Sequence, residues 1–295
     1  MNINEFTDKV VKAAQEVLGD EYRVCAKEVL KNNDTLLHGV MISGKDTRIT
    51  PTIYVDNFLP QYEDGMPFGD IMSKIIGAFR EGERKTDIDL SFFSEFDKVK
   101  DRICYRLLAV ERNRELLEMV PYIPFLDLAI VFYYALDSET LGNASIMIRY
   151  EHMDMWETDV STLMKLASEN TPRLFPAGCK SLLEVLKEML QERYPYGDEE
   201  IPMLVASNET RLQGASVILY PDFLEDVAGR NEANLFVIPS SVHEVLLLPD
   251  RGNLSSEMLR DLIRSVNSTS VDPVEVLSDN LYYFDRSEKQ VRIIA

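Results

Sequence analysis

The stretch YRVCAKEVLKNNDTLLHGVMI, which occupies residues 22–42, decides the fold class. Two runs suited to β-strands, Tyr22–Leu30 and Thr35–Ile42, flank the turn sequence Asn32-Asn33-Asp34. A connection this short joins antiparallel neighbours, because parallel strands need a much longer crossover. The stretch therefore predicts a β-hairpin.

Strand signals recur in adjacent pairs along the rest of the chain. The apolar run Leu128–Leu136 predicts a central strand, and Ala144–Tyr150 predicts a strand beside it. Ile201–Ala206 and Ala215–Tyr220 predict two more strands, and helical stripes such as that of Asp159–Glu169 separate the pairs. Pairs of strands, rather than one strand per helix, favour mostly antiparallel sheets with packed helices, which is the α+β class.

The length of 295 residues is sufficient for two hydrophobic cores, and 45% apolar with 27% charged residues is typical of a folded protein. The stretch Tyr194–Glu200 combines Pro, Gly and acidic residues as a linker does. It divides the chain into a predicted N-terminal α+β region, residues 1–195, and a C-terminal α+β region, residues 196–295. The alternative is one continuous unit made of closely associated subdomains.

The formal charge of −19 opposes binding to a nucleic-acid backbone unless a local basic face overrides it. The densest basic stretch, Arg80–Lys85, also contains Glu81 and Glu83, so we expect no nucleic-acid partner. The acidic residues are then expected to confer solubility, and an acidic mimic of nucleic acid is the alternative.

Targeting and cofactor signals do not occur in the sequence. The first residues, MNINEFTDKV, lack the basic start and apolar run of a signal peptide, and no stretch reaches the ~18 apolar residues of a membrane span. We therefore expect a cytoplasmic protein with no membrane partner. Cys25, Cys104 and Cys179 fit no metal or disulfide spacing, which predicts reduced, buried thiols. No dinucleotide, phosphate-loop, nucleophile-elbow or zinc-protease motif occurs, so no cofactor is expected.

The segment PSSVHE, residues 239–244, contains the first candidate site. A histidine close to hydroxyl groups can serve acid–base or nucleophilic chemistry, which makes His243, Ser241 and Ser240 candidate catalytic residues. On a strand, Ser241 and His243 would share a face with their Cα atoms ~6.6 Å apart. The orienting acid would have to come from elsewhere, for example Asp279 or Asp285. The alternative is that Pro-Ser-Ser forms a turn and His243 makes structural hydrogen bonds.

Glu151, His152 and Asp154 form the second candidate site, because their side chains could supply ligands to one metal ion. The alternative is a strand-to-helix loop with acidic residues near the N-terminus of the next helix. Asp87 and Asp89 could likewise bind a divalent cation or belong to a solvated turn. His38, isolated in a predicted strand, is expected to be structural.

Six blocks of sequence carry a resemblance to a known family: Leu37-His38-Gly39, Thr50-Pro51-Thr52-Ile53-Tyr54, Phe125-Leu126-Asp127-Leu128, Gly214-Ala215-Ser216-Val217, Ile238-Pro239-Ser240-Ser241-Val242-His243-Glu244 and Val274-Glu275-Val276-Leu277-Ser278-Asp279. In this order they resemble a bacterial family of unknown function that is common in anaerobic gut Firmicutes. The resemblance covers nearly the whole chain and implies a bacterial cytosolic protein. It implies no activity, substrate, cofactor or catalytic residue.

The leading hypothesis is a non-enzymatic cytosolic binding or regulatory protein with a protein partner, and the negative charge favours a basic one. The rival hypothesis is a hydrolase centred on His243 with Ser240 or Ser241. A third is a metal-dependent enzyme that uses His152. The sequence does not decide whether the protein is an enzyme, and it predicts no oligomeric state.

Overall fold

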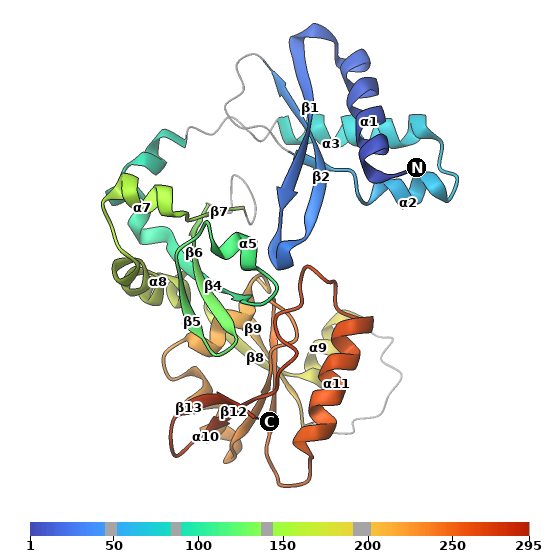
Figure 1. Ribbon diagram of the computed structural model, residues 1–295. Helices are drawn as coiled ribbons and strands as arrows, with labels where there is room; N and C mark the ends of the chain where they lie inside the picture. The colour runs from blue at the N-terminus through green and yellow to red at the C-terminus, as the bar shows by residue number, and fades with distance from the viewer. Residues whose placement is uncertain (45–51, 84–89, 137–143, 191–201, 295) are drawn as a thin grey trace. The chain divides into compact units, whose positions relative to one another are not determined.

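The computed structural model describes residues 1–44, 52–83, 90–136, 144–190 and 202–294 (Figure 1). The chain folds into two compact units, of which the first is Met1–Ser94 and the second contains the described residues from Glu95 onward. The predicted linker Tyr194–Glu200, and with it the predicted boundary at residue 195, lies outside the described residues. All the strand pairs described are antiparallel and helices pack on the sheets, so the predicted α+β class is confirmed.

The first unit is built around the predicted hairpin. Strands β1 (Tyr22–Leu30), β2 (Leu36–Gly44) and β3 (Thr52–Tyr54) form an antiparallel sheet in that order. The turn between β1 and β2 places Asn33 at φ 59°, a left-handed conformation that asparagine tolerates better than most residues. The hairpin prediction is therefore confirmed, together with its turn residues.

Helices α1 (Ile3–Leu18), α2 (Phe58–Glu63) and α3 (Phe68–Glu83) complete the first unit. A capping box formed by Asn2 and Glu5 starts α1. The apolar faces of the helices pack with one face of the sheet in a single core, whose fully buried members are Phe6, Val10, Ala14, Val40, Ile42, Val55, Ile71 and Ile75. A short 3₁₀-helix, Leu90–Ser94, ends the unit.

The second unit contains a four-stranded and a six-stranded sheet. The four-stranded sheet consists of β4 (Ile103–Ala109), β6 (Leu128–Ala135) and β5 (Tyr122–Phe125) in that order, with β7 (Ser145–Met147) also paired to β6. Every residue of β6 is buried, as predicted for a central strand. Helix α8 (Val160–Leu174) packs on β4, and the short helices α4 (Phe96–Val99), α5 (Arg114–Leu117) and α7 (Tyr150–Trp156) belong to the same part.

The six-stranded sheet has the order β13 (Gln290–Ile293), β12 (Tyr282–Asp285), β10 (Leu235–Ile238), β11 (Val245–Pro249), β9 (Leu204–Asn208) and β8 (Ala177–Ser181). It is accompanied by α9 (Leu182–Leu190), α10 (Phe223–Asn231) and α11 (Ser256–Thr269). A capping box between Ser181 and Glu184 starts α9. Strands β8 and β9, on either side of residues 191–201, are neighbours in this sheet.

One predicted strand is wrong. In place of the predicted strand Ala215–Tyr220 the chain forms a 3₁₀-helix, Gly214–Leu219, which Tyr220 follows, although the β-branched residues favour a strand. Gln213 turns the chain with a φ of 55°, and Gly214 then passes close to β9. Tertiary packing therefore overrides local propensity here. Every helix in the described part of the chain is too short or too polar to span a lipid bilayer.

Candidate functional site

His243 lies just before β11, in a segment that is paired with residues 274–278. The backbone N–H of Val242 donates to Glu275 O at 2.9 Å, and that of Leu277 donates to Ser240 O at 3.1 Å. Ser241 and Val276 form an isolated antiparallel bridge between the same two segments. The backbone just before His243 is thereby held against the segment that contains Glu275.

Both nitrogens of the His243 ring have partners. The Nε2 atom lies 3.2 Å from Oε1 of Glu275, and Nδ1 accepts a hydrogen bond from the backbone N–H of Gln213 at 3.3 Å. Because Nδ1 faces a donor, the neutral ring carries its proton on Nε2 and donates it to the carboxylate. The His243 side chain is 25% exposed. A half-buried histidine–carboxylate pair is the result.

The two serines of the candidate site do not contact the ring through their hydroxyl groups. Ser241 Oγ accepts from the backbone N–H of His243 at 3.1 Å, which is a local turn interaction. Of the two proposed orienting acids, Asp285 accepts from the neighbouring Ser287, and Asp279 is paired elsewhere. The acid next to His243 is Glu275, which is 32 residues away in sequence, so spacing alone gave no signal for it.

Gly214 brings the 3₁₀-helix against this centre. A Cβ atom at that position would lie 2.1 Å from Ser207 Oγ, 2.5 Å from His243 O and 2.8 Å from Asn208 N. The hydroxyl of Ser207 donates to His243 O at 2.7 Å. Only glycine fits this approach without a shift of the surrounding backbone. The surroundings of the His243 backbone are therefore closely packed, and the Ser207 hydroxyl is directed at its carbonyl oxygen.

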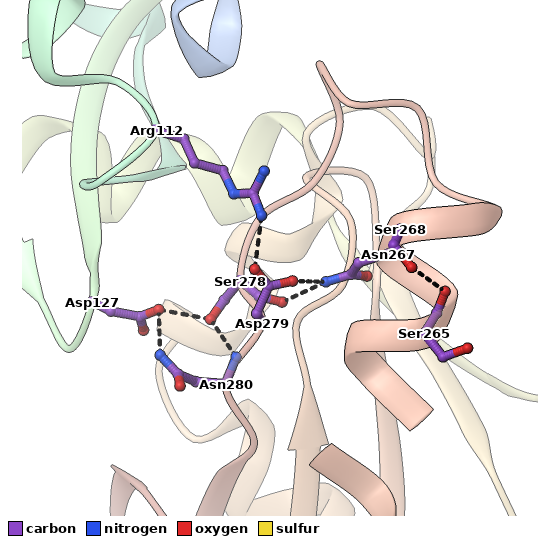
Figure 2. A network of polar contacts seen from close by, with 8 residues as sticks. All are labelled: Arg112, Asp127, Ser265, Asn267, Ser268, Ser278, Asp279 and Asn280. Carbon is purple, nitrogen blue, oxygen red and sulfur yellow. Dashed lines mark hydrogen bonds and ion pairs between the residues drawn. The ribbon is translucent and has the colours of Figure 1, made fainter. Parts of the chain in front are cut away.

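A second polar cluster joins the segment that follows Glu275 to Asp127, in the turn between β5 and β6 (Figure 2). The Asp127 carboxylate accepts hydrogen bonds from Ser278 Oγ at 2.6 Å, from Asn280 Nδ2 at 3.0 Å and from the hydroxyl of Tyr282. Burial, together with the negative charge of Asp127, raises the pKa of Tyr282, so the phenol keeps its proton and donates. These bonds connect the four-stranded sheet to the start of β12.

Asp279 makes two further connections in the same cluster (Figure 2). It accepts from Asn267 Nδ2 at 2.8 Å and pairs with Arg112 at 2.7 Å. Burial alone would raise the pKa of Asp279, but the Asn267 hydrogen bond and the Arg112 ion pair outweigh it and hold the pKa below its usual value. Arg112 follows β4 and Asn267 belongs to α11, so this carboxylate also connects the two sheets.

The three metal-ligand candidates lie on helix α7 rather than in a loop. His152 Nδ1 accepts from the backbone N–H of Arg149 at 3.1 Å, and the His152 ring packs on Trp156 with 5.7 Å between centroids. Burial, and to a lesser degree the charge of Arg149, lowers the pKa of His152. Helical rotation of ~100° per residue points Glu151 and His152 in different directions and His152 away from Asp154. In the described ranges, no three His, Cys, Asp or Glu side chains are grouped to hold a metal ion.

The remaining polar candidates are placed as follows. Asp87 and Asp89 lie outside the described residues. His38 has a partner in Asp56, whose Oδ1 lies 3.0 Å from the ring Nδ1 and whose Oδ2 accepts from the His38 backbone N–H at 2.8 Å. This arrangement fixes the end of β3 to β2 within the first unit.

The three cysteines are free, but only one is deeply buried. Burial raises the pKa of Cys104 to about 12, and it also raises the pKa of the half-buried Cys179. Cys25 is half-buried in β1. The prediction of reduced thiols agrees with this state, whereas full burial holds for Cys104 alone.

A row of cations along β1 was not predicted from the sequence. Arg23 and Lys27 are exposed, and side chains four apart on a strand lie on the same face. Lys31 continues the row, with its Nζ 4.7 Å from the centre of the Tyr54 ring. This side of the sheet, opposite the helices, is here called the cationic face and consists of Arg23, Lys27, Lys31 and Tyr54. Its signal was the four-residue spacing of cations within a predicted strand.

Neither Arg23 nor Lys27 forms an ion pair with any described residue. The cross-strand neighbours on this face are uncharged, because Arg23 pairs with Ser43, Lys27 with Gly39 and Gly39 with Tyr54. The face is thus a local positive area on an acidic chain.

An open pocket of about 580 Å³ in the second unit contains none of the predicted site residues. Aromatic and charged side chains line it, and an ion pair between Lys289 and Glu225, 2.6 Å long, joins two of its walls. The lining includes Phe125, Tyr220, Phe223 and Phe284. Asp222 is also among the lining residues, and the exposed lining of the pocket is more polar than apolar.

Residues 3–286 match the family of unknown function DUF5688. No curated protein and no solved structure matches the chain. The match extends from α1 through β12 and so includes both units, the His243 centre and the Asp127 cluster. The chain belongs to the DUF5688 family, as its sequence blocks indicate.

Proposed function

We propose that this chain is a non-enzymatic binding or regulatory protein of the bacterial cytosol, and that its cationic face recognises an acidic segment of a protein partner. The observation that carries the proposal is the row formed by Arg23, Lys27 and Lys31, whose two exposed cations have no ion pair with any residue in the described ranges. An anion placed beside them gains attraction without breaking such a pair.

The shape of the face favours an extended segment. At a rise of ~3.4 Å per residue, successive cations of the row stand ~14 Å apart along the strand. A peptide in extended conformation beside β1 repeats its side chains on the same spacing, so carboxylates four residues apart would meet successive cations. Tyr54 adds an aromatic surface beside Lys31. The chain as a whole is acidic, so attraction centres on this face, and the partner differs from the basic one expected from net charge.

The polar groups of the second unit support a non-catalytic role. His243 has both ring nitrogens engaged, and Asp127 accepts three hydrogen bonds. A general base needs a free nitrogen directed at the proton it removes. These groups serve instead to hold segments of the chain together, which leaves recognition to exposed surfaces.

The test is capture of the tagged full-length protein from its own bacterium under native conditions, with mass spectrometry of the bound material. The wild type is compared with a double variant of the face, Arg23→Glu with Lys27→Glu. The matched control is Lys12→Glu with Lys165→Glu, which makes the same charge change at two exposed positions on α1 and α8. We expect one stoichiometric partner with an acidic segment, lost from the face variant and kept by the control.

Three results would contradict the proposal. One is a partner that both double variants retain equally. Another is bound material that nuclease removes, since this identifies nucleic acid as the ligand. The third is the absence of any stoichiometric partner from wild-type preparations.

A hydrolase centred on His243 is the second candidate, because Glu275 lies where an orienting acid would stand. It requires Ser240 or Ser241 to approach the ring in a rearranged state. Labelling with a fluorophosphonate probe tests it, with Ser241→Ala, Ser240→Ala and His243→Gln as variants. Labelling of the wild type that these variants abolish would support the hydrolase over the binding protein.

A further inference from the structure

Strand β1 is an edge of the three-stranded sheet, since β2 is its one partner among the described strands. The backbone groups of successive residues in a strand point to alternate edges. The backbone N–H of Lys31, just after β1, donates to Thr35 O at 2.9 Å, so the odd-numbered residues of β1 direct their backbone groups at β2. Ala26 and Glu28 therefore direct theirs away from the sheet.

The side chain of Gln15 agrees with this direction and closes one end of the edge. Its Nε2 donates to Tyr22 O at 2.9 Å, and its Oε1 accepts from the backbone N–H of Val24 at 3.0 Å. The amide thus takes the place that the backbone of an added strand would occupy there. Ala26 and Glu28 are exposed, and no group in the described ranges forms a hydrogen bond with their outward N–H and C=O groups.

We propose that the acidic segment binds as an additional strand on the outer edge of β1, an inference that rests on the function proposed above. The backbone of the segment would pair with Ala26 and Glu28, as extended peptides pair with open sheet edges in β-augmentation. The small side chain of Ala26 leaves this edge accessible. Main-chain hydrogen bonds then supply affinity for an extended chain, and the neighbouring side chains decide which chain binds.

Those neighbouring side chains favour an acidic strand. Lys27 lies between Ala26 and Glu28 and points to the cationic face, so one residue of the added strand stands directly beside it. A carboxylate at that place would have its Cβ atom ~4.5–5.5 Å from that of Lys27. An acidic residue beside Cys25 would lie diagonally to both Arg23 and Lys27, within reach of their long side chains. The expected ligand therefore has acidic residues at alternate positions.

Lysine on an edge strand commonly protects a sheet from pairing with other chains. At β1 this protection is selective, because Arg23 and Lys27 repel a basic strand, gain nothing from a neutral one and attract an acidic one. Glu28 projects from the opposite face of β1, so it does not meet the acidic side chains of the ligand.

The test uses the full chain and a synthetic probe, a peptide of about seven residues in which glutamate and threonine alternate. Fluorescence anisotropy at low ionic strength measures its dissociation constant. The probe is compared with two N-methylated forms, one methylated on the threonine amides and the other on the glutamate amides. Because only alternate amides face β1, we expect one form to bind about tenfold more weakly and the other to stay within about threefold of the parent.

Ala26→Pro tests the same edge from the side of the protein. Proline removes the outward N–H of this residue without removing a bond to β2, so we expect the fold to be kept and the binding of the probe to fall roughly tenfold. The matched control is Ala177→Pro at the start of β8, where the N–H also points away from the paired strand β9. Thermal unfolding reports on the folding of both variants.

Equal affinities of the two methylated forms would overturn the strand addition, as would unchanged binding to Ala26→Pro. If the probe still lost affinity for the double variant Arg23→Glu with Lys27→Glu, the function proposed above would stand without it. Equal binding to wild type and double variant would contradict that function itself. A probe that does not bind the wild type also overturns the strand addition, and native capture then decides the proposed function separately. A wild-type dimer that Ala26→Pro dissociates would assign the edge to a second copy instead.

Discussion

The two units of this protein use charged residues in opposite ways. In the first unit, helices and a hairpin share one apolar core, while Arg23 and Lys27 stand exposed on β1 without an ion pair to any described residue. In the second unit, Asp127 and Asp279 are engaged by groups from distant segments and connect two sheets. The difference indicates that charge is a means of assembly in the second unit and is available for recognition in the first.

The largest expected effect comes from Asp127. Asp127→Asn removes a charge that accepts three hydrogen bonds and turns an amide toward donors, so we expect a loss of about 2 kcal/mol in the stability of the second unit. Hydrogen exchange with mass spectrometry should show protection lost in β6 and β12 and unchanged in β1 and β2.

Asp154→Asn is the matched control, because it makes the same substitution at an exposed residue of α7. Equal loss of protection in both units after Asp127→Asn would contradict the inference that charged groups hold only the second unit together.

Substitutions at two glycines, Gly39 in the first unit and Gly214 in the second, are expected to have effects of intermediate size on stability. At Gly214, an added Cβ meets backbone atoms of His243 and Asn208, so Gly214→Ala is expected to cost about 1–3 kcal/mol. At Gly39, the nearest atom is Cγ2 of Thr52, at 2.2 Å, which belongs to a side chain. Gly39→Ala should therefore cost less, and Thr52→Ala should recover most of the loss.

Urea denaturation measures these differences. Gly178→Ala is the control, since its added Cβ would have Ser207 O at 3.8 Å as its neighbour, which is ordinary contact. A Gly39→Ala variant that Thr52→Ala fails to improve would contradict the distinction between side-chain and backbone neighbours.

The smallest expected effect concerns the ion pair between Arg112 and Asp279, whose side chains are 40% and 41% exposed. Arg112→Gln should destabilise the second unit by a few tenths of a kcal/mol at neutral pH. Because Arg112 helps to lower the folded pKa of Asp279, its contribution is full above the unfolded pKa of about 3.9. The contribution is lost as the pH falls through the lower, folded pKa.

Denaturation of wild type and Arg112→Gln at pH 7, 4 and 2.5 follows this loss. The control is Arg114→Gln, which breaks a more exposed pair with Glu111 and should change stability less. If the difference in the free energy of unfolding between wild type and Arg112→Gln grew at low pH, the predicted pH dependence would be contradicted.

Local features of the fold were predictable from the sequence. The hairpin follows from the two strand-like runs that flank the turn and from Asn33, which takes the left-handed turn conformation. β6 follows from an uninterrupted apolar run, and the start of α9 follows from the Ser181 capping box. Each signal lies within a few residues of the structure it determines.

Features that depend on distant residues were not predictable. β8 (Ala177–Ser181) has the sequence AGCKS, with no β-branched or aromatic residue, and is a strand because β9 lies beside it. Glu275, the partner of His243, is 32 residues away from it in the sequence, and Ser278, which donates to Asp127, is 151 residues away from Asp127. Sequence reasoning found His243 but assigned it the wrong neighbours, because no periodicity encodes such pairings.

The span between Asp127 and its donors also has a consequence for synthesis of the chain. Ser278 is translated 151 residues after Asp127, which at ~5–20 residues per second takes roughly 8–30 s. Throughout that interval the Asp127 carboxylate has already been synthesised, but the donors that it accepts from in the folded unit have not. The hairpin of the first unit, whose partners all lie within residues 22–44, has no such wait. The nascent chain therefore completes its first unit early, and the second stays unfinished until the segment carrying Ser278 and Tyr282 appears.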